Sequence, residues 1–191
     1  GIGEGLALAM AGRGAIIGLI ARRRELLEDL AERCRAAGGE ARVFALDVTD
    51  EKAVVEAADA MRAEFGRIDI LIGNAGVGGV DDETQAYTPR AVKKLIDINL
   101  MGAVNAVYAV VKPMVERGSG QIVAVSSLAS FRGIPKSAAY SASKAGMNAF
   151  FESLRLDLLE TGVDVTIIQP GFIRTPLTSA RAAKMPFIME R

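Results

Sequence analysis

The sequence of 191 residues contains no histidine, no tryptophan and a single cysteine, Cys34. Without histidine the protein has no histidine base, no histidine-bound metal and no Ser-His-Asp triad, and we expect no metal site. One cysteine cannot form an internal disulfide, which favours a reducing compartment, the cytoplasm.

An excess of charge is also missing, because 23 Lys and Arg residues balance 23 Asp and Glu residues. Without a basic field, the chain is not expected to bind nucleic acid or an anionic membrane surface. No apolar run approaches the roughly 18 residues of a membrane span, so we expect no such span. The N-terminus has neither Met nor a signal-peptide pattern, and we expect the sequence to start part-way through a gene product.

The residues that are present indicate one folded domain, since 50% are hydrophobic and 24% are charged. Short apolar runs alternate with longer helical patterns. The expected strands are 15–20, 43–46, 68–72, 121–125 and 163–168, and the expected helices are 24–37, 51–65, 88–117 and 141–160. Because the strands are apolar on both faces, this order predicts a doubly wound parallel sheet of the Rossmann type, with three α/β/α layers.

Gly-rich and polar clusters follow the strands, at the edge of the sheet where such folds bind ligands. Gly1 and Gly3 precede an apolar helix, and glycines there let backbone N–H groups approach a phosphate. Arg22 and Arg23 follow Ala21, a position where a site for NAD carries an acidic residue. Arginines suit the 2′-phosphate of NADP(H), and solvated surface arginines are the alternative interpretation.

Helix caps are expected at two further places. Asp47 follows the second strand and either caps the next helix, in competition with Asp50, or accepts a hydrogen bond from an adenine. Thr88 and Pro89 form an N-cap and N1 pair for the long helix.

Two tyrosine–lysine pairs, Tyr140–Lys144 and Tyr108–Lys112, have the spacing that puts both side chains on one helix face. A fixed lysine ammonium is expected to lower the pKa of a tyrosine, so that the tyrosine can act as acid or base near neutral pH. Tyr140 follows a strand-end loop, whereas Tyr108 lies deep within the long helix. We therefore take the first pair as the candidate site and the second as packing and surface charge.

Two further polar residues are candidates for the same site. Ser127, after the strand 121–125, can donate a hydrogen bond to a substrate oxygen, with Ser126 as its rival. Asn99 lies inside the long helix, either as an ordinary polar position or as a residue that binds backbone or water.

Taken in order, these residues resemble the short-chain dehydrogenase/reductase family. In that family the serine stands thirteen positions before the tyrosine, which selects Ser127 over Ser126 and Tyr140 over Tyr108. The resemblance rests on motifs that span nearly the whole chain: Gly1-Ile2-Gly3, Leu46-Asp47-Val48, Asn74-Ala75-Gly76, Asn99, Val125-Ser126-Ser127, Tyr140-Ser141-Ala142-Ser143-Lys144, and Pro170-Gly171 with Thr175.

The resemblance implies a role for each matched residue. Tyr140 would exchange a proton with the substrate oxygen, and Ser127 would polarise that oxygen. Lys144 would lower the tyrosine pKa and bind the nicotinamide ribose, and Asn99 would hold a water linked to Lys144. The other matches would bind the cofactor: Gly1, Ile2 and Gly3 at the pyrophosphate, Asp47 and Val48 at the adenine, Asn74, Ala75 and Gly76 beside the adenine ribose, and Pro170, Gly171, Ile173 and Thr175 around the nicotinamide.

The sequence therefore predicts an NADP(H)-dependent oxidoreductase that moves a hydride between nicotinamide and a carbonyl or secondary alcohol. A non-catalytic dinucleotide sensor or scaffold is the alternative, and isomerase or dehydratase chemistry with a retained cofactor is another. The family carries a further strand and Thr-Gly before its first Gly-Ile-Gly, and a helix and strand after the last matched motif. We therefore expect a single dinucleotide-binding and catalytic domain, residues 1–191, truncated at both ends.

Two expectations concern the surroundings of the site. The helices 88–117 and 141–160 are expected to pair copies into a homodimer or homotetramer. The candidate pocket residues are Phe131, Ile134, Phe172 and Leu177, and the segment after Thr175 through Met185-Pro186-Phe187 is expected to form a lid.

Overall fold

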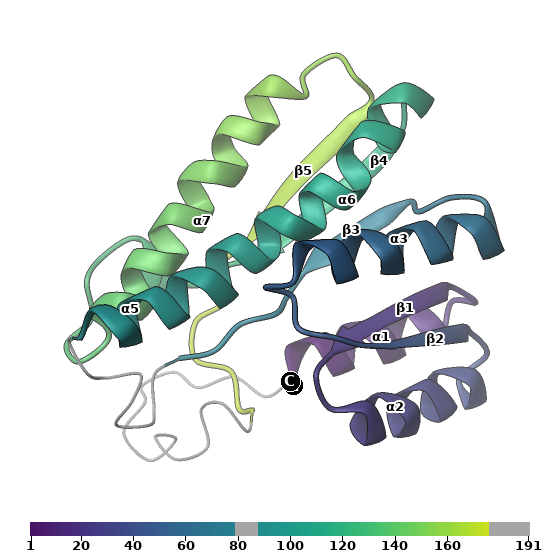
Figure 1. Ribbon diagram of the computed structural model, residues 1–191, viewed down its shortest axis with the longest axis horizontal. Coiled ribbons are helices and arrows are strands. Elements are labelled where there is room, and N and C mark those ends of the chain that lie inside the picture. Colours follow the sequence, from purple (N-terminus) through teal and green to yellow (C-terminus); the bar gives the residue numbers. More distant parts are fainter. Residues whose placement is uncertain (79–87, 176–191) are drawn as a thin grey trace.

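The computed structural model describes residues 1–78 and 88–175, in which parallel strands alternate with helices (Figure 1). The strands are β1 (Ile16–Ala21), β2 (Glu40–Ala45), β3 (Ile70–Gly73), β4 (Gly120–Val125) and β5 (Val163–Ile168). The helices are α1 (Ile2–Ala11), α2 (Arg24–Ala36), α3 (Glu51–Phe65), α5 (Pro89–Ile96), α6 (Gly102–Arg117) and α7 (Ala138–Asp157). Two short turns complete the set, the π turn η1 (Asp97–Met101) and the 3₁₀ turn η2 (Leu128–Ser130). Each expected strand and helix is present, with ends shifted by a few residues.

The strands form two parallel sheets, one of β1 and β2 and one in the order β3-β4-β5. In the first sheet Ala21 lies beside Ala45, and in the second Val125 lies beside Ile168, so the carboxyl ends of neighbouring strands are aligned. The Rossmann-like parallel fold is confirmed. β1 and β3 do not pair with each other, and both line one cleft of about 1110 Å³.

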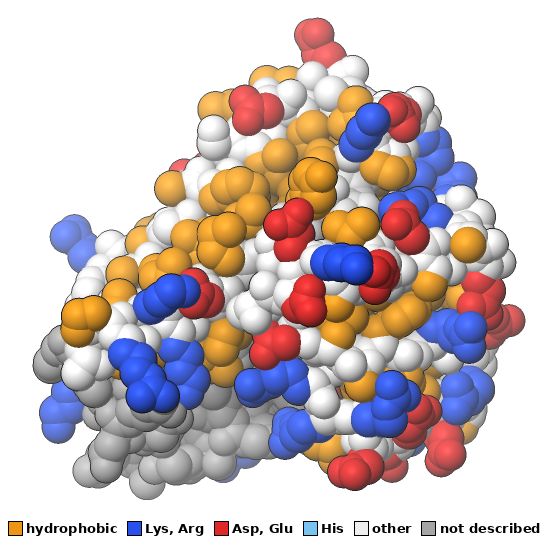
Figure 2. All heavy atoms as spheres, in the orientation of Figure 1, with side chains coloured by type: hydrophobic (Ala, Val, Ile, Leu, Met, Phe, Trp, Pro, Cys, Tyr) orange, Lys and Arg blue, Asp and Glu red, His pale blue; other side chains and the backbone are white. Residues whose placement is uncertain are grey.

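Two apolar cores support the two sheets. The smaller core joins β1 and β2 to α1 and α2, and it contains Ala7, Ala11, Leu19, Leu27, Ala31 and Cys34. The larger core joins β4 and β5 to α3, α6 and α7, with Met147 and Phe151 fully buried. Figure 2 shows that apolar side chains also gather on the surface along α6 and α7. The strand ends are thus held by helices packed on each sheet.

The long helix expected over 88–117 is divided by the π turn η1 into α5 and α6. Thr88 caps α5 as expected, because its Oγ1 accepts from the N–H of Ala91 at 3.2 Å, with Pro89 in the first turn. Gly102, the first residue of α6, allows a close approach, since a Cβ there would lie 2.6 Å from Cγ2 of Val48.

The same stretch corrects the expectation that no segment has the length and apolarity of a membrane span. Within the described residues, the helical stretch Pro89–Arg117 is long and apolar enough to cross a membrane by length and composition alone. In the structure 44% of its apolar window is buried, and α6 packs against α3 and β3. The core helix of a globular fold passes the same test, so packing accounts for the apolar stretch.

Candidate active site

The cleft between β1 and β3 gathers most of the residues expected to bind a cofactor. The expected residues that line it are Gly1, Ile2, Gly3, Arg22, Arg23, Asp47, Val48, Asn74, Ala75, Gly76, Tyr140, Lys144 and Thr175. Pro170, Gly171 and Ile173 do not line it. The first two lie beside η2, where the N–H of Leu128 donates to the carbonyl oxygen of Pro170 at 3.0 Å.

The first turn of α1 lies at this cleft. Gly1 is the N-cap and supplies no side chain to bind the first N–H groups of the helix. Gly3 packs against the side-chain amide of Asn74, which a Cβ at this position would displace. Uncapped N–H groups and the positive end of the helix dipole make this end of the cleft suited to a pyrophosphate.

Arg22 and Arg23 lie between β1 and α2, and both line the cleft. Nη1 of Arg22 is 3.9 Å from Oδ2 of Asp47, and the Arg22 side chain is 65% exposed. A contact of this length between exposed groups is weak. Arg22 is therefore able to pair with an anion that enters the cleft.

Asp47 does not cap α3, which corrects one of the two readings of its position. Its Oδ1 accepts from the N–H and the hydroxyl of Thr49 at 3.0 and 2.9 Å. The cap is Asp50, whose Oδ1 accepts from the N–H of Ala53 at 3.1 Å. The bonds from Thr49, with a smaller effect of Arg22, lower the pKa of Asp47, so this side chain is a carboxylate with a fixed orientation.

Tyr140 and Ser127 meet at the carboxyl end of β4. Tyr140 lies in the first turn of α7, Ser127 directly precedes η2, and the Ser127 hydroxyl is close enough to Tyr140 to lower its pKa. Oγ of Ser127 also accepts from the N–H of Ala129 at 3.2 Å. Ser126 is buried, and its Oγ donates to the carbonyl oxygen of Lys144 at 3.4 Å. Of the two serines, Ser127 is the one in contact with the tyrosine.

The pKa of Tyr140 differs in direction from the expectation. Burial raises it, and the hydrogen bond with Ser127 offsets only part of this effect. Nζ of Lys144 donates to the carbonyl oxygen of Val125 at 2.9 Å and lies 3.8 Å from Sδ of Met147. Burial also lowers the pKa of Lys144 to about 8. The expected net lowering of the tyrosine pKa is wrong here, because burial disfavours the charged form of Tyr140 more than its interaction with Ser127 favours that form.

Asn99 is fully buried in the π turn and bonded through its whole amide. Its Oδ1 accepts from the N–H of Val77 at 2.8 Å, and its Nδ2 donates to the Val77 carbonyl and to Oγ of Ser143, both at 2.9 Å. Ser143 in turn donates to the carbonyl oxygen of Tyr140 at 2.8 Å. Asn99 thus ties the Gly-rich loop after β3 to α7, which no ordinary polar helix position does. Its contact with a water stays a prediction.

The loop that Asn99 holds lies directly against the tyrosine and the lysine. Gly78 has φ 150°, and a Cβ there would overlap the ring of Tyr140. A Cβ on Gly76 would lie 3.4 Å from Oδ1 of Asn99 and 3.6 Å from Nζ of Lys144. Backbone without side chains therefore forms this wall of the site, which leaves the tyrosine ring in place.

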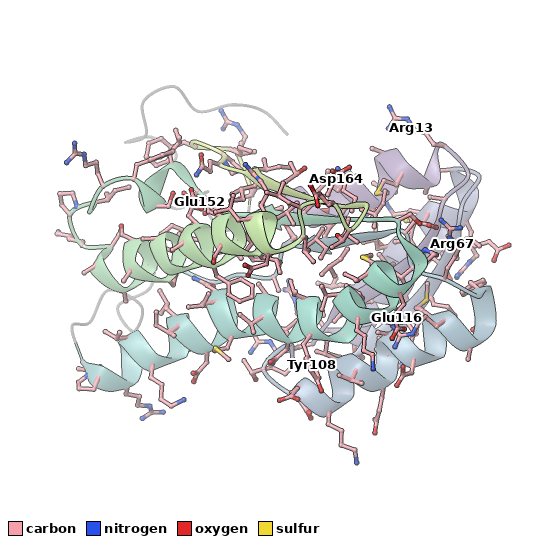
Figure 3. The ribbon with its side chains drawn as sticks, turned by 90° about the horizontal axis from the view of Figure 1, so that it is seen from above. Arg13, Arg67, Tyr108, Glu116, Glu152 and Asp164 are labelled. Atoms are coloured by element: carbon pink, nitrogen blue, oxygen red, sulfur yellow. The ribbon has the colours of Figure 1, made fainter. Side chains whose placement is uncertain are left out.

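The second tyrosine–lysine pair lies elsewhere. Tyr108 is on the outer side of α6 beside the start of α3, and it is 64% exposed (Figure 3). Lys112 forms an ion pair with Glu116 at 3.8 Å. Neither residue of the pair lines the cleft. The two pairs of equal spacing are thus clearly separated in space.

The expected substrate-pocket residues are only partly described. Phe131 and Ile134 are exposed between η2 and α7, and Phe172 is half-buried after β5. Leu177 and the expected lid through Met185-Pro186-Phe187 lie outside the described residues.

Sequence reasoning missed two asparagines that hold the site from behind. Nδ2 of Asn105 in α6 donates to the carbonyl oxygen of Val48 at 2.9 Å. Nδ2 of Asn148 in α7 donates to Oγ of Ser130 at 2.7 Å. Both asparagines are buried. The available signal was an asparagine in the middle of an apolar helix, where its propensity is low.

A parallel α/β fold with glycine-rich turns at the carboxyl ends of its strands defines the Rossmann-like class of dinucleotide-binding folds. Comparison with known proteins narrows this class. The family model for short chain dehydrogenases matches residues 1–186 of the chain. The chain belongs to the short-chain dehydrogenase/reductase family.

Individual relatives agree with this assignment. A Myxococcus xanthus protein described as an uncharacterized oxidoreductase is 46% identical over 190 residues, which cover 100% of this chain and 75% of that protein. The structure of NAD⁺-bound xylitol dehydrogenase has 35% identity and a TM-score of 0.88, with 96% of this chain and 71% of that chain covered. A metagenomic short-chain oxidoreductase in complex with NADP has 33% identity and a TM-score of 0.81, with 95% and 80% covered. The protein is therefore an oxidoreductase of this family, whose fold binds a nicotinamide dinucleotide.

Proposed function

We propose that the protein is an NADP(H)-dependent oxidoreductase that interconverts a small carbonyl compound and a secondary alcohol, with Tyr140 as general acid and base. The observation that carries the proposal is the half-buried side chain of Tyr140, which interacts with Ser127 and lines the cleft together with Lys144. Ser127 itself is not among the residues that line the cleft, and Tyr108, which has the same spacing from a lysine, is exposed.

In the reduction, Ser127 and Tyr140 hydrogen-bond to the carbonyl oxygen of the substrate. Tyr140 then gives its proton to this oxygen as the carbon receives a hydride, and the product is the alcohol. A bound nicotinamide cofactor supplies this hydride, and it accepts one in the reverse reaction. The raised pKa keeps the Tyr140 hydroxyl protonated at neutral pH, which suits a proton donor. With a pKa of about 8, Lys144 is mostly charged at pH 7 and stabilises the tyrosinate that forms.

The cleft fits a nicotinamide dinucleotide, because the uncapped start of α1 and the side chains of two neighbouring strand ends share it. Asn99 holds the loop Asn74–Val77 in its place through Val77. The residues that we assign to the cofactor are Gly1, Ile2 and Gly3 for the pyrophosphate, Asp47 and Val48 for the adenine, Asn74, Ala75 and Gly76 for the adenine ribose, Lys144 for the nicotinamide ribose, and Pro170, Gly171, Ile173 and Thr175 for the nicotinamide.

The chain's own residues favour NADP(H) over NAD(H). One structural relative is bound to NAD⁺ and another to NADP, so the family as a whole does not decide the choice. At the end of β1 this chain has Ala21, which cannot accept from a ribose 2′-OH, followed by Arg22 and Arg23. An exposed guanidinium with only a long contact to Asp47 is suited to a 2′-phosphate.

The test is turnover of a panel of aliphatic and aromatic ketones, aldehydes and secondary alcohols with NADPH and NADH. We expect Tyr140→Phe to remove nearly all turnover and to leave NADPH binding intact. Tyr108→Phe, the matched control, should keep the rate within a few-fold. A protein that binds NADPH and turns over none of the panel would be a sensor or scaffold. A dead Tyr108→Phe variant would move the site to the other pair.

We also infer that the enzyme works in the cytoplasm as a homodimer or homotetramer, paired through the helical stretch Pro89–Arg117 and α7. Large apolar side chains are exposed on these helices and at their ends, among them Met101, Tyr108, Leu156 and Leu159 (Figure 2). Exposed apolar patches of this kind mark interaction surfaces. A monomer in light scattering at micromolar concentration would contradict this inference. A single buried cysteine, Cys34, is the support for a reducing compartment.

A further inference from the structure

A chain of hydrogen bonds runs from α7 to the backbone of Ser127. Oγ of Ser130 donates to the carbonyl oxygen of Ser127 at 2.6 Å, which uses the only proton of that hydroxyl. The same Oγ is 2.7 Å from Nδ2 of Asn148 and therefore accepts from it. Because Ser130 has no second proton to give, the atom of Asn148 that faces it must be the nitrogen. The two hydrogen bonds therefore run from Asn148 to Ser130 and from Ser130 to Ser127.

Asn148 belongs to the face of α7 that holds the site. It follows Tyr140 and Lys144 at intervals of four residues, so the three side chains lie one above another. The side chain of Tyr140 lies beside that of Ser127, and Nζ of Lys144 donates to the carbonyl oxygen of Val125. Asn148 acts on Ser127 indirectly, because it donates to Ser130, which in turn donates to the carbonyl oxygen of Ser127.

The Asn148 amide is not explained by stability. Asn148 is 8% exposed, and its Oδ1 is a buried side-chain atom without a hydrogen-bond partner among the described residues. An unpaired buried acceptor carries a desolvation penalty that an apolar residue at this position would avoid. The N–H group that bonds Ser130 is what an apolar residue would lack.

Ser127 needs support on both sides to present its hydroxyl. Its Oγ is turned by the N–H of Ala129, and its carbonyl accepts both the N–H and the Oγ of Ser130. A loose η2 turn would leave the hydroxyl free to rotate away from Tyr140. Such a change acts on the reacting oxygen and not on Arg22, Asp47 or the start of α1, which we assign to the cofactor.

We propose that Asn148 and Ser130 are positioning residues, which hold η2 so that the hydroxyl of Ser127 stays directed at Tyr140 and the substrate oxygen. This inference rests on the proposed function, and it assigns to that site two residues outside the tyrosine, serine, lysine and Asn99 set. Both act through Ser127 and touch neither substrate nor cofactor.

The test measures kcat and both KM values with NADPH and the ketone of the panel that is reduced fastest. We expect Ser130→Ala and Asn148→Ala to lower kcat about tenfold, with the KM for NADPH within twofold of wild type. Ser130→Thr, which keeps the hydroxyl, should retain most of the rate. The matched control is Asn105→Ala, because Asn105 is also a buried helix amide that bonds a backbone carbonyl. It holds Val48, so its effect should appear in the KM for NADPH.

The outcomes separate this inference from the proposed function. Loss of turnover in Tyr140→Phe with full kcat in Ser130→Ala and Asn148→Ala overturns the positioning role alone. So does an equal kcat loss in Asn105→Ala with an unchanged KM for NADPH, because the effect would then be general loosening. Full turnover in Tyr140→Phe overturns the proposed function and this inference together. If Asn148→Ala does not fold, Ser130→Ala, at a half-buried position, decides by the same split.

Discussion

The two parts of the chain on either side of residues 79–87 differ in whether they bury polar side chains. In the first part charged side chains are paired at the surface, as in Arg42–Glu64 and Arg24–Glu28. The second part holds all the buried polar residues of the described chain: Asn99, Asn105, Ser126, Ser137, Ser141, Ser143, Lys144 and Asn148. Exposed charges are screened by salt, whereas desolvated hydrogen bonds are not. Substitutions in the first part should therefore alter binding in a salt-dependent way, and those in the second should alter turnover or stability.

The largest effect that would test this contrast is expected at Lys144. Lys144→Met should reduce turnover by about 100-fold or more, because the charge that stabilises the tyrosinate is lost. The same variant should be more stable at pH 7. The folded-state pKa of about 8 lies below the ordinary value of 10.5, so the unfolded chain binds the proton more tightly. The free-energy cost of burying the charged Lys144 is full below pH 8, and it disappears as the pH rises towards 10.5.

The expected gain for Lys144→Met is limited by the lost bond to Val125. We expect a net gain of about 1–2 kcal/mol at pH 7, or a rise of roughly 2–8 °C in Tm that shrinks at pH 10. Thermal unfolding at both pH values measures it. Lys112→Met, on an exposed side chain, is the control and should change neither Tm nor turnover. A lower Tm for Lys144→Met at pH 7 would contradict the buried-charge account.

The next effect concerns the surface charge of the first part. Arg22→Ala should reduce kcat/KM for NADPH roughly 10- to 150-fold, the value of one charge-assisted hydrogen bond, and leave NADH nearly unchanged. Ala21→Asp should shift the preference towards NADH, because a carboxylate repels the 2′-phosphate and accepts from a 2′-OH. The measurement uses fixed low and high ionic strength, and the wild-type preference should weaken with salt. Wild type that prefers NADH, or equal losses with both cofactors in Arg22→Ala, would refute the assignment.

A smaller effect is expected from pH. Alcohol oxidation needs Tyr140 without its proton, and burial raises the pKa of this group above its ordinary value. The kcat for oxidation should therefore rise, by at most about tenfold per pH unit, between pH 7 and 9. Lys144 loses its charge near pH 8, which should flatten the rise above that point. Carbonyl reduction should be level from pH 6 to 7.5. Oxidation that is independent of pH over this range would show that another group carries the proton.

The smallest effect compares two neighbouring aspartates of the first part. Asp50 caps α3, so Asp50→Ala should cost about 0.5–2 kcal/mol of stability. Asp47 bonds only Thr49 and Arg22 among the described residues, so Asp47→Ala should change Tm less and act on NADPH binding instead. Thermal unfolding and NADPH titration of both variants measure the difference. An equal loss of Tm in the two variants would mean that the Asp47 turn is part of the cap.

The parts of the fold that depend on local sequence were predictable. Apolar runs located the strands, and the cap at Thr88 located the start of α5, because caps and strand patterns involve neighbouring residues. The position of Tyr140 after a strand-end loop, and not its spacing from Lys144, placed this pair at the cleft, since Tyr108 and Lys112 have the same spacing and lie elsewhere. The direction of the Tyr140 pKa was not predictable, since it depends on how much of the chain buries the ring.

Tertiary contacts explain what else was missed. The partners of Asn99 are Val77 and Ser143, which lie far from it in the sequence, so the sequence shows only an asparagine in a helix. Whether Asp47 or Asp50 caps α3 depends on which residue begins the helix. Sequence patterns locate this boundary only to within a few residues.

The π turn Asp97–Met101 sets the direction in which the side chains of α6 point relative to those of α5. One additional residue within the turn rotates every later side chain by about 100° about the helix axis. α5 can therefore bury Leu95 while α6 turns Gly102 and Asn105 towards Val48. Deleting one residue from the turn would barely alter composition or helix propensity. It would, however, direct each residue of α6 to the wrong neighbour, so the length of this turn is as constrained as the identity of Asn99 within it.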